Sequence, residues 1–386
     1  MTIRLSLDYY DNDHKKKLTF DQPYASARTA SKVSAFQANS AISKADFYSY
    51  LLIHRQALVG YRSYAELLGK MSVAVNWIQD VVTTAAETLH LTRPGYRDKD
   101  LAEKVGESVG LCVISRLHRM TDADWTRLDT LPGVNGVKTF DFEIGSDGIR
   151  IIQVETKGSF LNDCRKKPTV VSNHANSIAG KKAAWETHPN FPQPSSIRYG
   201  TIAGIDAEHD ARCWLLDPPA EDVSTDPFDL RVAKRLGFVA NSIATIAPTA
   251  SLPRIIGERI NQILSFGARS FDGVALRTRG GRQFSPDSYV ENFLARDKIF
   301  IEDLDIVGKL VQGGSEAPIF VGMKGDLARN AVRQNVNEIA ATIFEQAELG
   351  VREIDSEHQQ IGSVRRKIPI NFQVSSGGFI LGFPVE

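Results

Sequence analysis

The spacing of apolar residues changes twice along the chain, and these changes divide it into three regions. Residues 1–40 are mostly polar, and we interpret them as an arm or a loosely packed edge. From about 43 to 91 the apolar residues recur every three or four positions, which is typical of amphipathic helices. A Pro-Gly pair at 94–95 is a turn signal, so we end this N-terminal arm and helical region, 1–95, at residue 95.

The second region, 96–245, alternates between helical and strand-like patterns. A Gly-Ser-Asp-Gly turn at 145–148 separates two of its strand-like runs, as in a hairpin. The expected elements are a helix over 99–120, strands over 137–144 and 149–157, a helix over 172–185, and strands over 199–205 and 211–216. This order predicts an α/β fold in which helices flank a mixed sheet.

The third region, 246–386, mixes helices and strands in a different order and is expected to be α+β. Its predicted elements are a helix over 253–266, a strand over 271–277, a long helix over 326–349, and paired strands over 368–374 and 378–383.

The hairpin of the second region carries the residues that point to chemistry. Glu155 and Lys157 are two positions apart on a strand, so their side chains project from the same face. Asp141, on the preceding strand, shares that face only if the connection has three residues and a glycine bulge; two or four residues would put it opposite. The three-residue register separates an apolar face from a polar face, and we therefore expect it.

Two carboxylates and a lysine on one face suit metal-assisted hydrolysis of a phosphodiester. Asp141 and Glu155 offer the hard oxygen ligands that Mg²⁺ prefers, and the metal activates a water and polarises the phosphate. Lys157 can orient that water and offset the charge that develops in the transition state.

These residues resemble the motif of the PD-(D/E)xK nuclease superfamily, which has a restriction-endonuclease-like fold. Asp141 matches the first acidic position, and Glu155-Thr156-Lys157 matches the E-x-K tripeptide. The order of elements over roughly 95–220 matches as well: a helix, a hairpin that bears the motif, a helix and two further strands.

The resemblance implies further site residues. It implies that a glutamate of the preceding helix joins the active site, and Glu107, after Gly106, fits that place better than Glu103. It also implies that the metal is held by Asp141, Glu155 and the backbone carbonyl of Thr156, with Mg²⁺ as the cofactor and Mn²⁺ as a substitute.

The expected function is therefore that of a Mg²⁺-dependent endonuclease, acting on DNA in preference to RNA. The resemblance implies a role in prokaryotic restriction or antiphage defence, a homodimer or larger assembly, and control by an activating ligand or partner protein. The alternative is a non-catalytic module that binds nucleic acid or a partner and retains the nuclease fold.

Charge limits where a nucleic acid can bind. The chain has 46 basic and 46 acidic residues, so a polyanion must contact a local patch. A basic stretch just after the motif is the candidate for such contacts, with Arg165, Lys166, Lys167, Lys181 and Lys182. Neither a long apolar segment nor a secretory signal is present in the sequence, so we expect a cytoplasmic protein without membrane contact.

One further motif is a lookalike. Residues 106–110 match G-x-S-x-G, but a nucleophile elbow needs a strand before its serine, and this serine falls inside the helix expected over 99–120.

Overall fold

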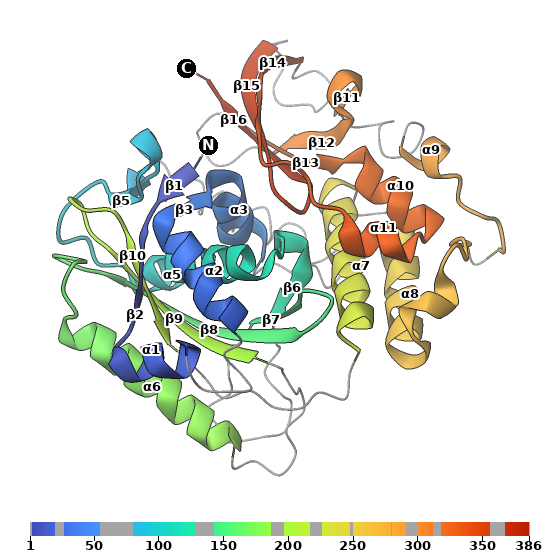
Figure 1. The fold of residues 1–386 in the computed structure, drawn as a ribbon. Coiled ribbons are helices and arrows are strands. Elements are labelled where there is room, and N and C mark those ends of the chain that lie inside the picture. The colour runs from blue at the N-terminus through green and yellow to red at the C-terminus, as the bar shows by residue number, and fades with distance from the viewer. Residues whose placement is uncertain are drawn as a thin grey trace.

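The computed structural model describes residues 2–19, 27–54, 80–127, 143–186, 197–216, 226–247, 250–278, 280–290, 299–311, 318–355 and 367–385. Within these residues the chain forms two six-stranded sheets with helices packed around them, which confirms the α/β class (Figure 1). None of the helices in these ranges is both long and apolar enough to span a bilayer.

The first sheet, here called the core sheet, is mixed. Its strand order is β2-β10-β9-β8-β7-β6, and the β10–β2 and β9–β8 pairs are parallel whereas the others are antiparallel. Its strands are β2 (Ser6–Tyr9), β6 (Trp125–Arg127), β7 (Glu143–Ser146), β8 (Ile151–Phe160), β9 (Ile197–Ile205) and β10 (Arg212–Leu216).

Two long helices cover opposite faces of this sheet. Helix α5 (Lys99–His118) is capped by the Asp98 side chain, and its Gly106 packs directly against Gly158 of β8. Helix α6 (Thr169–Glu186) lies on the other face, where its Ile178 sits over Gly200 of β9. Strand β8 is therefore buried on both sides, as parallel strands joined by a helix require.

The N-terminal residues do not form a loose arm. Ile3, Leu5 and Leu7 alternate with polar residues and are almost fully buried, and β2 is an edge strand of the core sheet, paired with β10. The segment after 80 is not helical either, because it forms the short pair β4–β5. The elements of this region are β1 (Thr2–Arg4), α1 (Asn12–Thr19), α2 (Ala27–Ala38), β3 (Ala41–Ser43), α3 (Lys44–Ser49), η1 (Tyr50–His54), β4 (Val82–Thr83), η2 (Ala85–Glu87) and β5 (His90–Leu91), with η3 (Asp122–Asp124) following α5.

A helical layer follows the core sheet in the chain. Helix α7 was expected to belong to the second region, which ends at 245. It packs instead against α8 of the third region, and Leu236 of α7 and Ile256 of α8 belong to one apolar cluster. The elements of this layer are α7 (Pro227–Ile246), α8 (Leu252–Phe266), η4 (Ala268–Phe271), α9 (Pro286–Ser288), α10 (Gly325–Arg333) and α11 (Val336–Ala341).

Two predictions for the third region, a strand over 271–277 and a long helix over 326–349, are wrong. Residues 271–277 form a turn and an isolated bridge between Arg277 and Gln283 rather than a strand. The long helix over 326–349 ends at Arg333, because Gln334 adopts a left-handed conformation, and the chain after α11 turns into a strand.

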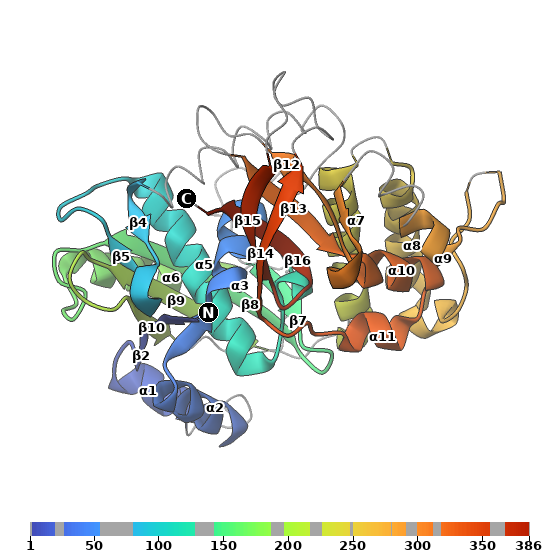
Figure 2. The same ribbon diagram turned by 90° about the horizontal axis from the view of Figure 1, so that it is seen from above.

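The second sheet is antiparallel and has the order β11-β12-β13-β16-β15-β14. Its strands are β11 (Ile299–Ile301), β12 (Ile306–Val311), β13 (Ile319–Lys324), β14 (Glu348–Asp355), β15 (Lys367–Val374) and β16 (Phe379–Pro384), with η6 (Glu302–Leu304) between the first two. Val321 and Phe379 pack into the apolar cluster of the core, whereas Val307 and Met323 pack with the helices of the layer. Seen from above, these strands lie over the junction between the core and helices α7 and α8 (Figure 2).

Candidate functional site

The candidate site is centred on Glu155, in the middle of β8. Its side chain is completely buried on the face that α6 covers. The Nζ atoms of Lys157, two residues along the strand, and of Lys181, from α6, each lie 2.7 Å from Glu155 Oε1. Two ammonium groups thus share one carboxylate oxygen, in contacts short enough to be charge-assisted hydrogen bonds.

The position of Lys181 follows from the buried stripe of α6. Val171, Ala175, Ile178 and Lys182 are buried at helical spacing, and Lys181 is adjacent to the last of them. The stripe therefore brings a lysine, in place of an apolar residue, against the strand that carries Glu155.

The second oxygen of Glu155 has a different environment. Oε2 is buried and accepts no hydrogen bond from the described part of the chain. A buried carboxylate oxygen left in this state is costly unless a cation or water satisfies it. Because carboxylate oxygens are preferred ligands of Mg²⁺, this oxygen fits a divalent cation.

Helix α5 and helix α6 both contribute polar residues near Lys157. His174 of α6 bonds through Nε2 to Ser159 Oγ of β8, at 2.8 Å. Burial, and then the charge of Lys157, lowers the pKa of His174, while Glu103 of α5 acts in the opposite direction. The lowered pKa favours the neutral imidazole, and β8 lies between α5 and α6 at this point.

The expected acid of the preceding helix, Glu107, is buried in α5. It directly follows Gly106, which contacts β8 one residue beyond Lys157. Ser108 of the G-x-S-x-G lookalike bonds to the carbonyl of Lys104 inside the helix, so this segment is not a nucleophile elbow.

The hairpin register differs from the one that we expected. Ser146 pairs with Ile151 and Gly145 with Ile152, so residues 147–150 form the connection, closed by hydrogen bonds to the side chain of Asp147. A four-residue connection is one of those for which we expected Asp141 on the face opposite Glu155, so the reason for grouping the two carboxylates is lost. The expected register assumed one apolar and one polar face, but α5 and α6 bury both faces of β8. Asp141 itself lies outside the described residues, as does the whole segment 128–142.

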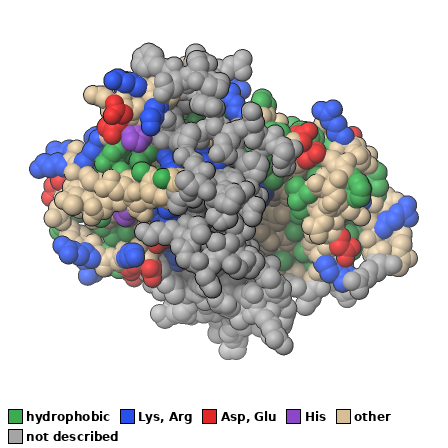
Figure 3. All heavy atoms as spheres, turned by 90° about the horizontal axis from the view of Figure 1, so that it is seen from below, with side chains coloured by type: hydrophobic (Ala, Val, Ile, Leu, Met, Phe, Trp, Pro, Cys, Tyr) green, Lys and Arg blue, Asp and Glu red, His purple; other side chains and the backbone are tan. Residues whose placement is uncertain are grey.

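The expected nucleic-acid-binding residues do not form one surface. Arg165 and Lys166 are exposed and pair with Asp163, and Lys167 bonds to the carbonyl of Tyr10. Lys181 and Lys182 are buried near the other end of α6, about 20 Å from the start of the helix at the usual rise per residue. Over the described part of the lower face, basic and acidic side chains lie interspersed (Figure 3).

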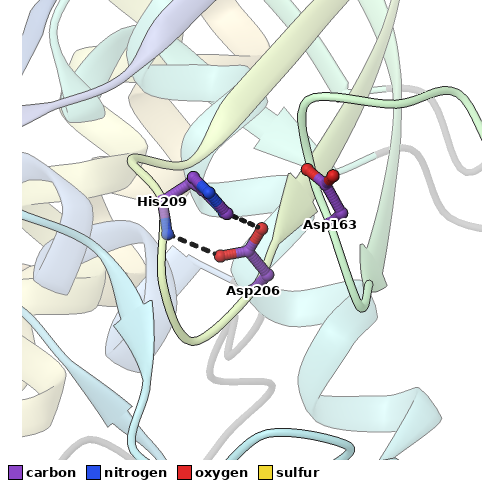
Figure 4. A group of neighbouring side chains, drawn as sticks. All are labelled: Asp163, Asp206 and His209. Carbon is purple, nitrogen blue, oxygen red and sulfur yellow. Dashed lines mark hydrogen bonds and ion pairs between the residues drawn. The ribbon is translucent and has the colours of Figure 1, made fainter.

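A second group of residues lies at the far end of β8 and β9. Ligand atoms of Asp163, Asp206 and His209 lie within 4.8 Å of one another, close enough to hold one metal ion (Figure 4). However, both oxygens of Asp206 already accept hydrogen bonds, from the backbone of Cys164, Glu208 and His209 and from the His209 ring. This group therefore suits a turn cap better than a metal centre.

Sequence reasoning assigned Lys181 to phosphate contacts and missed its bond to Glu155. The signal that would have indicated it is the helical spacing of Val171, Ala175 and Ile178, which extends to 181 and 182.

The chain was compared with known proteins. It matches no family model, no curated protein and no solved structure.

Proposed function

We propose that this protein is a Mg²⁺-dependent nuclease whose active site is built on Glu155 and Lys157 of β8. The observation that carries the proposal is the state of Glu155: a buried carboxylate with one oxygen held by lysines and the other suited to a cation. A solvated strand with a surface ion pair would show neither feature.

The order of elements supports the same proposal. Helix α5, the hairpin β7–β8, helix α6 and the strands β9 and β10 occur in the order that the resemblance to the PD-(D/E)xK superfamily implies, with η3 and β6 between α5 and β7. Glu155 and Lys157 lie on β8, which corresponds to the strand expected over 149–157.

In this proposal Glu155 and the backbone carbonyl of Thr156 hold Mg²⁺. Asp141 was expected beside them only for a three-residue connection, and the hairpin has a connection of four residues. When bound, the metal supplies a Lewis acid that polarises the phosphate and lowers the pKa of a water. Lys157 orients the attacking water and offsets the charge that develops on the phosphate oxygens. The apolar packing of α5 and α6 around β8 keeps these contacts in a low-dielectric setting, where they are stronger.

The experiment that tests the proposal compares wild type with Lys157→Met on plasmid DNA, single-stranded DNA and RNA. Each reaction is run with Mg²⁺, with Mn²⁺ and with EDTA. We expect metal-dependent cleavage, of DNA in preference to RNA, that falls by about 100-fold or more in the variant, the usual size of such a loss.

Lys367→Met is the matched control, because Lys367 is an exposed lysine of β15, in the second sheet. Equal cleavage by wild type and Lys157→Met would overturn the site assignment. Binding of DNA by wild type without cleavage under any of these conditions would favour the alternative, a non-catalytic binding module.

A role in prokaryotic restriction or antiphage defence, in the cytoplasm, belongs to the same proposal and rests on the resemblance of the motif. Cutting both strands of a duplex needs two active sites, so we propose a homodimer or larger assembly, controlled by an activating ligand or partner protein. Phage plating on cells that express wild type or Lys157→Met, and the mass of the purified protein in solution, test these two points.

A further inference from the structure

Lys181 and Lys157 do not approach Glu155 in the same way. Lys157 is on the same strand and face as Glu155, so their proximity is set by strand geometry. Lys181 reaches Oε1 from another element, α6, and its side chain is only 10% exposed. Two ammonium groups therefore contact one carboxylate in the interior, where charge interactions are strong.

A divalent cation on Glu155 would stand within a few ångströms of both ammonium groups. At that range like charges repel strongly inside a protein, since the effective dielectric constant is far below that of water. The metal would bind Oε2, beside the two ammonium groups on Oε1, and the repulsion between these positive charges is relieved if one lysine moves away.

We propose that the ammonium group of Lys181 neutralises Glu155 in the metal-free protein and is displaced from it when a divalent cation binds. Loading of the site is then an exchange of one cation for another. The inference rests on the proposed function in one respect, that Glu155 is a metal ligand. Lys181 acts through Glu155 and is a positioning residue, whereas Lys157 stays beside the carboxylate.

The test measures Mn²⁺ affinity by electron paramagnetic resonance on the full-length protein. Lys181→Met should bind Mn²⁺ about tenfold more tightly or better, because a repelling charge has been removed. Lys181→Arg keeps the charge and should bind as wild type does. Unchanged or weaker binding by Lys181→Met would overturn the proposal.

Two variants separate this inference from the proposed function. Lys367→Met removes the same charge from an exposed position and should leave Mn²⁺ affinity unchanged. Glu155→Gln should abolish the binding. If Glu155→Gln binds Mn²⁺ as wild type does, the metal site of the proposed nuclease is refuted; if only the Lys181→Met result fails, the exchange alone is refuted.

A second measurement uses the wild-type protein and so does not depend on how variants fold. Lysine acetylation by a small activated ester is followed by mass spectrometry with and without Mn²⁺. Displacement from Glu155 should raise the acetylation rate of Lys181 several-fold relative to that of Lys367. A rate that does not rise would contradict the exchange.

Discussion

Gly106 of α5 and Gly158 of β8 touch backbone to backbone. A Cβ added at Gly106 would lie 2.3 Å from the Cα of Gly158, and one added at Gly158 would lie 1.9 Å from the carbonyl oxygen of Ala102. This contact lets the helix approach the strand next to Lys157, so the shape of the candidate site depends on two residues that have no side chain.

Gly106→Ala should destabilise the protein by about 1–3 kcal/mol, because the methyl group has no space and α5 must move away from β8. Urea unfolding measures the change. Gly180→Ala is the matched control, since Gly180 is also helical but has open space around it; it should be stabilising by up to about 1 kcal/mol. Equal effects at the two positions would show that the close contact is not real.

Two buried carboxylates at the junction between the core and the second sheet make stability depend on pH. Asp46 of α3 accepts hydrogen bonds from Ser376 and Gln346, and Asp122 accepts them from Ser49 and Gly377. Burial, and then the charge of Asp122, raises the pKa of Asp46 from its ordinary 3.8 to about 8. Burial raises the pKa of Asp122 as well.

A raised carboxyl pKa means that the folded state binds the proton more tightly than the unfolded state. Its contribution to stability is therefore complete below pH 4 and is lost as the pH rises through about 8. The free energy of unfolding should fall over this window, by up to about 1.4 kcal/mol per pH unit for one proton. Asp46→Asn, which cannot ionise, should flatten the dependence and be the more stable protein at pH 9.

Urea unfolding at pH 5, 7 and 9 checks this, with Asp303→Asn as the control because Asp303 is an exposed carboxyl. A variant Asp46→Asn whose pH dependence equals that of wild type would contradict the interpretation.

Asp124 joins the core to α7 through two arginines. Arg235 contacts both of its oxygens, at 2.6 and 3.0 Å, and Arg231 adds a contact at 3.1 Å. Asp124→Asn would leave two largely buried guanidinium groups without their anion and should cost roughly 3–5 kcal/mol. A loss below about 1 kcal/mol in chemical unfolding would show that the arginines are compensated by other groups.

The two candidate metal positions can be told apart by one pair of variants. Burial opposes ionisation of Asp206, but hydrogen bonds from Cys164, Glu208 and His209 outweigh it and lower the pKa of Asp206 to about 2. Asp206→Asn should therefore cost about 1–3 kcal/mol of stability and leave Mn²⁺ binding intact. Glu155→Gln should abolish Mn²⁺ binding. Loss of Mn²⁺ binding in Asp206→Asn alone would move the metal to the Asp163, Asp206 and His209 group.

Local pattern was sufficient for the elements of the core. The helices α5 and α6 and the strands β8, β9 and β10 lie close to the ranges that periodicity and turn signals predict, because each has its own apolar stripe or run. The same reasoning failed at the end of α10. The helix ends because Gln334 adopts a left-handed conformation, which the spacing of apolar residues does not predict.

The sequence by itself determined that Glu155 and Lys157 share one face of a strand, since this holds in any register. Only the tertiary structure decided what surrounds them. Strand β2 pairs with β10 across more than 200 positions of the chain, and Lys181 meets Glu155 because α6 packs over β8. Such contacts depend on how separate elements dock, and the burial of both faces of β8 removed the polar–apolar alternation from which a hairpin register can be inferred.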